Sequence, residues 1–192
     1  MKAARKTDLQ VTQGKVQETG TGFLMVQGPK ERAQLKHGRQ QQAVLSFRYR
    51  MPSEKELPLA SGGIVRQIGL KLRTKNTCNL LYVMWRICPD EYIFVTLKRN
   101  PGESMHRQCR ASGYQTIAII PLSSLQITAK DNKIHTVSAS LNLQVNAYRL
   151  SVIVDDHKLW SGTIDLDLLN DINGPAGFRS DNGNFIFKLF TE

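Results

Sequence analysis

From residue 42 onward the chain consists of short runs rich in Val, Ile, Leu, Tyr and Phe, separated by clusters of Gly, Pro, Asn and Asp. Such runs predict β-strands, which we expect near 22–27, 43–51, 64–74, 79–88, 91–99, 115–120, 133–142, 147–155, 158–164 and 184–190. No segment keeps a helical period for three turns, and only 122–128 and 166–170 are expected to form short helical turns. Parallel strands need crossover helices, so the pattern predicts an all-β fold with antiparallel strands.

The connections between the strands carry their own signals. A tight hairpin is expected at Pro89-Asp90, which joins two runs of similar length, and a second hairpin at Asp155-Asp156-His157-Lys158, whose acidic residues suit a turn. Residues 28–42 and 52–63 are interpreted as polar connections. The segment 102–113 has no apolar pattern and is interpreted as a long loop, a kind of segment that often carries function.

A chain of 192 residues with 41% hydrophobic content is long enough to bury the core of one β-sandwich. We expect a single domain over 1–192, within which 1–20 could be a loosely attached segment. The first residues lack the apolar run of a signal peptide, and no stretch reaches the ~18 apolar residues of a membrane helix. The compartment is left open, with an extracellular or periplasmic one favoured if an export signal has been removed.

The net charge of +10 is concentrated in the first part of the chain. Residues 1–110 hold 20 Lys and Arg against 8 Asp and Glu, whereas residues 111–192 hold 6 against 8. This asymmetry favours an anionic partner such as an acidic glycan, a nucleic acid or an anionic membrane. A basic surface with no particular partner is the alternative.

Three cysteines, Cys78, Cys88 and Cys109, are too few for a disulfide scaffold, and no pair has zinc-ligand spacing. The odd count leaves either three free thiols or one disulfide and one free thiol. If 79–88 and 91–99 form a hairpin, Cys88 lies about 30 Å from the end that holds Cys78. A bridge between Cys78 and Cys109 is therefore more plausible than one with Cys88, provided that the compartment is oxidising.

The last third of the chain has a characteristic order of motifs. Leu150 to Asp156 leads to Leu159-Trp160-Ser161-Gly162, then to Gly174-Pro175-Ala176-Gly177-Phe178-Arg179-Ser180-Asp181-Asn182 and to Phe185 to Leu189. This order resembles the closing hairpins of the concanavalin A-like lectin/glucanase superfamily, including laminin G-like jelly rolls. The resemblance covers 132–190 by motif and the rest by strand pattern, and it implies a two-sheet antiparallel jelly-roll β-sandwich. It does not imply one activity, because the superfamily includes lectins, hydrolases, lyases and adhesion modules.

The resemblance also allows a check for the catalytic residues of the superfamily. The E-x-D-x-E run of its hydrolases is missing, and the nearest pairs, Glu54 with Glu56 and Asp165 with Asp167, are interpreted as solvated surface residues. The Q-I-H triplet of its alginate lyases is reduced to Gln67-Ile68-Gly69. We therefore predict no catalytic residues, no cofactor and no metal ligands. The resemblance leaves calcium open, through Asp155, Asp156 or Asp181.

In four predicted strands, 43–51, 64–73, 80–88 and 91–99, an apolar set of side chains alternates with a basic or amphipathic set. If these strands share one sheet, the second set forms an outer, concave face with Arg48, Arg50, Gln67, Lys71, Tyr82, Arg86 and Lys98. Such a face suits carboxylate, sulfate or phosphate groups, and His106 in the long loop could cover it. The alternative is that the face is the solvated side of a sandwich.

These features lead to a functional prediction with alternatives. We expect a non-catalytic, lectin-like carbohydrate-binding module whose basic concave face takes an acidic glycan or another anionic ligand. A divergent glycoside hydrolase or polysaccharide lyase is one alternative, and a structural or adhesion module that binds a protein partner is another. Nucleic acid is not expected as a ligand, since no aromatic ladder or helix-turn-helix pattern accompanies the charge. The oligomeric state is left open.

Overall fold

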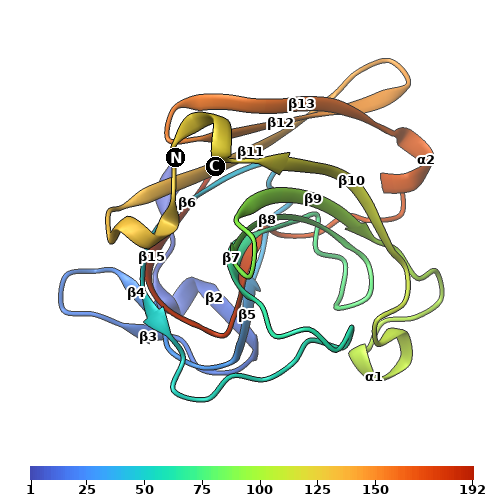
Figure 1. Cartoon of the computed structure of the whole chain (residues 1–192). Helices are drawn as coiled ribbons and strands as arrows, with labels where there is room; N and C mark the ends of the chain where they lie inside the picture. The colour runs from blue at the N-terminus through green and yellow to red at the C-terminus, as the bar shows by residue number, and fades with distance from the viewer.

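The computed structural model describes residues 1–192, apart from the side chain of Ser124, as two antiparallel sheets packed face to face (Figure 1). The 7-stranded front sheet has the order β10 (Tyr114–Pro121), β9 (Tyr92–Lys98), β8 (Leu80–Cys88), β7 (Arg66–Leu72), β14 (Gly177–Asp181), β5 (Lys30–Leu35) and β2 (Leu9–Gln13). The 8-stranded back sheet has the order β13 (His157–Asp165), β12 (Ala147–Val154), β11 (His135–Leu143), β6 (Gln42–Pro52), β15 (Gly183–Thr191), β4 (Leu24–Val26) and β3 (Gln17–Glu18), with β1 (Lys2–Ala3) paired to β15. The predicted all-β, two-sheet antiparallel sandwich is confirmed.

The helical elements are short and lie in connections between strands. They are α1 (His106–Cys109) and α2 (Leu166–Leu169), with 3-10 turns at Lys6–Asp8, Ser123–Leu125 and Ala129–Asp131. The helical turns that the sequence predicted within 122–128 and 166–170 are therefore present. The loop 102–113 contains α1, which the sequence pattern did not indicate.

The core lies between the two sheets and is built by alternate residues of each strand. Phe47 of β6 and Trp85 of β8 are both 0% exposed, and their rings meet edge to face with centroids 5.3 Å apart. Full burial of a phenylalanine stabilises the fold by about 1.5–3 kcal/mol, and a geometry of this kind adds to it. Trp85 is thus a core residue, as its place in the apolar set of its strand predicted.

Strand β5 corrects one prediction from the sequence. Residues 28–42 were expected to be a polar connection, but Lys30–Leu35 pairs with both β14 and β2. Its sequence, Lys-Glu-Arg-Ala-Gln-Leu, alternates between half-buried and buried positions. Only two of its inward-facing residues, Ala33 and Leu35, are apolar, so the strand lacks the apolar content that marked the predicted strands. The strands β1, β2, β3 and β14 were also not predicted.

The N-terminal segment is held by both sheets. Strand β1 pairs with β15, which places the N-terminus beside the C-terminus (Figure 1). Strand β2 pairs with β5 at the edge of the front sheet. Leu9 and Val16 are 5% and 2% exposed and belong to the core. Residues 1–20 are therefore part of the sandwich and not a loose extension.

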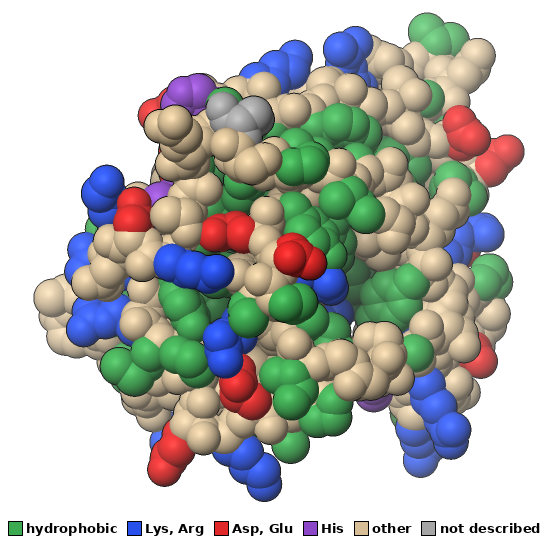
Figure 2. All heavy atoms as spheres, in the orientation of Figure 1, with side chains coloured by type: hydrophobic (Ala, Val, Ile, Leu, Met, Phe, Trp, Pro, Cys, Tyr) green, Lys and Arg blue, Asp and Glu red, His purple; other side chains and the backbone are tan. Residues whose placement is uncertain are grey.

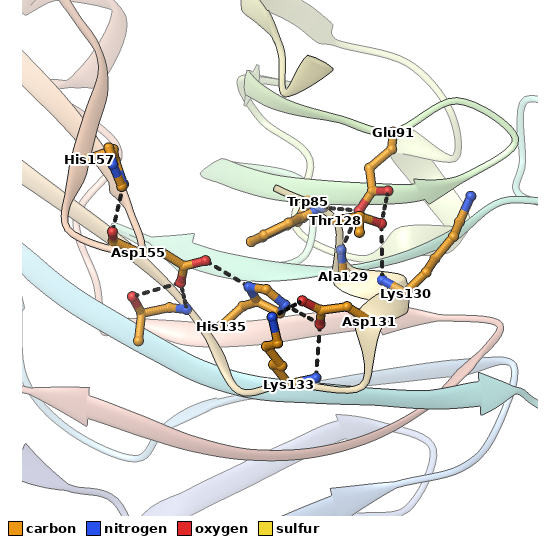
Figure 3. A network of polar contacts seen from close by, with 11 residues as sticks. Trp85, Glu91, Thr128, Ala129, Lys130, Asp131, Lys133, His135, Asp155 and His157 are labelled. Atoms are coloured by element: carbon orange, nitrogen blue, oxygen red, sulfur yellow. Dashed lines mark hydrogen bonds and ion pairs between the residues drawn. The ribbon is translucent and has the colours of Figure 1, made fainter. Parts of the chain in front are cut away.

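The hairpin between β12 and β13 turns at Asp155 and Asp156, where the sequence predicted it. Both residues have positive φ, 45° and 66°, as a type I′ hairpin turn requires. The Asp155 carboxylate accepts hydrogen bonds from the Thr136 backbone N–H and from His135 Nδ1, both at 2.7 Å (Figure 3). His135 Nε2 lies 2.9 Å from Asp131, so the imidazole is held between two carboxylates.

Candidate ligand-binding site

The outer face of the front sheet is hollowed by a cavity of about 510 Å³, called here the front cavity. This volume is in the range of pockets that hold small ligands, roughly 300–1,000 Å³. Side chains from the front sheet and two loops surround it: Gln13, Lys30, Arg32, Pro58, Leu59, Ala60, Ser61, Gln67, Arg86, Tyr92, Phe94, Thr96, His106, Arg110, Ala111, Tyr114, Thr116, Ile119 and Arg179. The residues therefore come from segments that are distant in the sequence.

The lining of the front cavity is positively charged. It contains Lys and Arg side chains but, among the residues that the structure describes there, no Asp or Glu. Asp181 lies behind the lining, 0% exposed, and binds Arg179 Nε at 2.7 Å and an Arg32 amino group at 3.3 Å. Burial raises the pKa of Asp181, but the two guanidinium groups outweigh it and hold the pKa below its usual value. One carboxylate thus compensates two arginines, whereas Lys30, Arg86 and Arg110 of the lining form no ion pair with the residues that the structure describes.

Two ionisable groups show the effect of this positive potential. Partial burial, and then the charges of Lys98, Arg32 and Arg179, lower the pKa of His106. Burial, and then Arg32 and Arg179, lower the pKa of Lys71 from 10.5 to about 7. In both cases the neighbouring cations disfavour a further positive charge. The same field favours an anion in the cavity.

Aromatic rings form part of the cavity wall. Tyr92 and Phe94 lie with centroids 5.9 Å apart, and the Arg86 guanidinium carbon lies 5.1 and 5.4 Å from the two centroids. Tyr114 stacks on Tyr82 with an angle of 22° between the ring planes. Cations over ring faces are attracted by the ring quadrupole, and exposed ring faces can pack against apolar faces of a ligand.

The loop that carries α1 is fastened to the front sheet beside the cavity. A disulfide joins Cys109 to Cys78 with a Cα–Cα distance of 5.9 Å, the pair that hairpin geometry favoured, and Cys88 is free. Lys98 Nζ lies 3.1 Å from the Arg110 carbonyl oxygen and 3.2 Å from Cys109 Sγ. These contacts hold His106 and Arg110 at the edge of the cavity.

The second loop reaches the cavity from the connection between β6 and β7. The Lys30 ammonium group donates a hydrogen bond of 2.8 Å to the Pro58 carbonyl oxygen. Asn182, fully buried, accepts a hydrogen bond from the Leu57 N–H and donates one to the Leu57 carbonyl. Residues Pro58 to Ser61 are therefore anchored over the β5 side of the cavity.

The predicted site residues fall into three groups, of which the first lines the cavity. Gln67, Arg86 and His106 are in this first group. The second group lies on the same sheet but is buried away from the lining: Lys71, Tyr82 and Lys98 are 2%, 4% and 1% exposed. Lys71 Nζ contacts Gln34 Oε1 at 3.4 Å and Lys98 Nζ contacts the Arg110 carbonyl oxygen at 3.1 Å, so both ammonium groups bind within the protein.

Arg48 and Arg50 form the third group. The assumption that their strand shares a sheet with the other three predicted strands was wrong. Their strand, β6, pairs with β11 and β15 in the back sheet and does not share a sheet with β7, β8 and β9. The chain crosses from one sheet to the other in the segment before β7. Alternation along a strand reports which side is apolar, but it does not report which sheet the strand joins. Arg48 and Arg50 are therefore remote from the front cavity.

Several cavity residues were not predicted. Arg32 was missed because β5 was interpreted as a connection, although the alternation in Lys30–Leu35 was a usable signal. Arg179 was noticed only as part of a fold motif. Tyr92 and Phe94 alternate with the core residues Ile93 and Val95, so their outward direction was readable from the strand pattern.

Basic side chains also occur away from the cavity. Figure 2 shows Lys and Arg side chains at several places around the visible surface, with acidic side chains between them. On the face that Figure 2 shows, the positive charge is thus spread out and not gathered in one patch. What distinguishes the front cavity is the absence of Asp and Glu from its described lining.

Three of the carboxylates considered for metal binding or catalysis have other partners. No group of three or more His, Cys, Asp or Glu in the described part of the chain could hold a metal ion. Asp155 binds His135, and Asp181 binds two arginines, so these carboxylates do not fit a calcium site. Glu56 forms an ion pair with Arg66 at 2.6 Å.

Comparison with known proteins agrees with this architecture. No family model and no curated protein matches the chain by sequence. The carbohydrate binding module CBM66 from Bacillus subtilis matches with a TM-score of 0.62 and 11% identity, over 94% of this chain and 91% of that chain. A legume lectin-like domain from Entamoeba histolytica matches with a TM-score of 0.58 and 9% identity, over 99% and 95%.

A third structure, the metal-free carbohydrate recognition domain of Emp46p, matches with a TM-score of 0.58 and 11% identity, over 96% of this chain and 88% of that chain. At such identities the likeness shows the fold. The concanavalin A-like lectin/glucanase fold that the motifs of 132–190 implied is confirmed.

The helices α1 and α2 have four residues each, and no helix of the described chain can span a bilayer.

Proposed function

Because the chain has the concanavalin A-like fold of lectins and carbohydrate-binding modules, we propose that it binds a carbohydrate in the front cavity and that this carbohydrate is acidic. The observation that carries the proposal is a cationic, aromatic-lined cavity whose described lining has no carboxylate. Aromatic faces suit sugar rings, and arginines suit carboxylate or sulfate groups. The Cys78–Cys109 disulfide supports an oxidising, extracytoplasmic compartment.

The test is binding of the full chain to a panel of neutral, carboxylated and sulfated oligosaccharides, measured by calorimetry. We expect acidic members to bind and their affinity to fall as salt is raised, because exposed charges are screened. Arg86→Gln should weaken binding of acidic members by about tenfold or more, since a charge-assisted hydrogen bond is worth about 1.5–3 kcal/mol.

Arg48→Gln is the matched control, because Arg48 is half-buried like Arg86 but lies on the back sheet. It removes the same charge from the molecule and should leave binding unchanged. Equal losses in the two variants would mean that net charge, and not the front cavity, attracts the glycan. Absence of binding to every member of the panel would contradict the proposed function.

A second function, cleavage of an acidic polysaccharide by elimination, is favoured by one observation. His106, Tyr92 and Tyr114 line the cavity, and each has a side chain that can accept or donate a proton. A hydrolase would need a pair of carboxyl groups there, and the described lining has none. Incubation with polyuronates, followed by ultraviolet absorbance of an unsaturated product, tests this activity. A product formed by the wild type and lost in His106→Gln or Tyr114→Phe would establish it.

A further inference from the structure

Part of the outer face of the front sheet is apolar. Leu80, Tyr82 and Met84 alternate with the core residues of β8, are buried, and form an apolar cluster apart from the main core. Phe94 of β9 packs against this cluster. The outer face of a sandwich that meets only water is expected to be polar. This part of the front sheet therefore differs from an ordinary solvated face.

The strand register places this apolar area and the two paired arginines in one row across the sheet. In strand order, residues directly opposite one another are Ile119, Phe94, Met84, Gly69, Arg179 and Arg32. Phe94 and Arg179 are three strands apart, which is about 14 Å at the usual strand spacing. Both ends of the row line the front cavity. The cavity thus has an apolar end and a cationic end.

The charges of the lining are divided in the same way. On β9 and β10, the described lining residues include no Lys, Arg, Asp or Glu; they are Tyr92, Phe94, Thr96, Tyr114, Thr116 and Ile119. The Lys and Arg residues of the lining lie on β5, β8, β14 and the α1 loop. Arg86 of β8 marks the boundary, since its guanidinium packs on the rings of Tyr92 and Phe94. A ligand that carries only charges and hydroxyl groups would leave the apolar end unmatched.

Ile119 is the part of the apolar end that is most open to solvent. Its side chain is 60% exposed, although it lies opposite Phe94 on a paired strand. A single exposed isoleucine is ordinary, but this one extends the apolar cluster into a cavity. Burial of apolar surface favours binding roughly in proportion to the area removed from water. The occupant that gains most is an apolar group on a ligand whose charge lies at the other end.

We propose that the ligand of the front cavity is an acidic sugar that carries an apolar substituent, an acyl or aryl group. The acidic part lies toward Arg32 and Arg179. The substituent lies on β9 and β10, where it contacts Phe94 and covers Ile119. This inference rests on the proposed function and narrows its ligand class.

The ligand arm of the test compares glycosides that share an acidic sugar and differ in the group attached to it. Methyl, butyl, octyl and phenyl glycosides of glucuronate and of galactose 6-sulfate are titrated into the full chain by calorimetry, below the concentrations at which micelles form. Affinity should rise from methyl to octyl by about tenfold or more, because apolar surface leaves water. The octyl and phenyl glycosides separate an aliphatic substituent from an aromatic one.

The protein arm uses two variants at the apolar end. Ile119→Thr keeps a β-branched residue on the strand and removes apolar surface. It should reduce the advantage of the octyl over the methyl glycoside by about threefold or more, and leave the methyl glycoside unchanged. Phe94→Leu keeps an apolar side chain without the ring and should reduce the advantage of the phenyl glycoside.

Ile134→Thr is the matched control, because Ile134 is 48% exposed and does not belong to the lining of the front cavity. It removes the same surface and should leave both advantages unchanged. Thermal melts establish that each variant is folded. Octyl glucoside, which has no charge, should bind more weakly than the acidic octyl glycosides, since it leaves the cationic end unmatched.

The outcomes separate this inference from the proposed function. Acidic glycosides or oligosaccharides that bind without any gain from an octyl or phenyl group overturn the inference and leave the proposed function in place. A gain that is unchanged in both Ile119→Thr and Phe94→Leu, or that is lost equally in Ile134→Thr, also overturns it, because the substituent then binds elsewhere. Absence of binding to every acidic glycoside and oligosaccharide overturns the proposed function itself.

Discussion

His135 shows how a single residue can make stability depend on pH. The side chain is 5% exposed and lies between Asp131 and Asp155 (Figure 3). Burial lowers the pKa of His135, but the hydrogen bonds to Asp155 and Asp131 outweigh it and raise the pKa above its ordinary value of 6.5. The charged imidazole therefore stabilises the folded chain.

We predict that this contribution is fully present below pH 6.5 and is lost as the pH rises through the raised pKa of His135 in the folded protein. His135→Gln should remove this part of the pH dependence. It should also destabilise the protein by about 1–3 kcal/mol at low pH, because two carboxylates lose a partner. Urea unfolding at a series of pH values measures both effects. Parallel stability curves for the variant and the wild type would contradict the prediction.

The pKa of His106 leads to a different prediction, which concerns the binding of an acidic ligand. Partial burial and the cations of the front cavity lower its pKa below 6.5, and a bound anion should raise it again. Binding of an acidic ligand then takes up a proton, so the affinity should increase as the pH falls toward the pKa of His106 in the free protein. Calorimetry in buffers of different ionisation enthalpy counts this proton. His106→Gln should show no uptake, and an equal uptake in the variant would exclude His106 as the source.

The loop that carries α1 is the element on which the shape of the cavity depends. It has one covalent attachment, Cys78–Cys109, across a sequence separation of 31, and Lys98 binds the Arg110 carbonyl beneath it. Because His106 and Arg110 belong to this loop, its position decides whether they reach a ligand. The front sheet itself does not depend on it, since β9 is paired with β8 along its whole length.

We predict that Cys78→Ser with Cys109→Ser lowers the free energy of unfolding by about 2–4 kcal/mol. Ligand affinity should fall too, since His106 and Arg110 lose their fixed position. Cys88→Ser is the control, because Cys88 is the free cysteine. Hydrogen exchange should show faster exchange in 99–113 than in the wild type. Unchanged exchange there would mean that the hydrogen bonds alone hold the loop.

At the scale of the whole molecule, the net charge of +10 acts on stability and on binding in opposite directions. Salt screens the repulsion among like charges, which favours the compact state, and it screens the attraction between the cavity and an anion. We predict that added sodium chloride raises the melting temperature and lowers the affinity for an acidic glycan. Thermal melts and calorimetry over one salt series check this. An affinity that is independent of salt would mean that the cavity binds its ligand without charge.

Much of the fold could be predicted from the sequence because it depends on local patterns. Alternation placed Trp85 in the core and Gln67 and Arg86 on the opposite side of their strands, and the residues Asp155 and Asp156 marked a hairpin. The position of Cys78 and Cys109 relative to one hairpin was enough to favour their disulfide. In each case the inference needed only the geometry of one strand or of two strands joined by a short turn.

Other features were decided by the tertiary structure. The sheet to which β6 belongs, and with it the place of Arg48 and Arg50, depends on pairing with β11 and β15, which lie far away in the sequence. The burial of Lys71 and Lys98 depends on contacts from Gln34 and from the α1 loop. The sequence by itself determined which side of each strand is apolar. Only the packing of distant segments determined which polar sides meet in one cavity, because alternation holds no information about the partner of a strand.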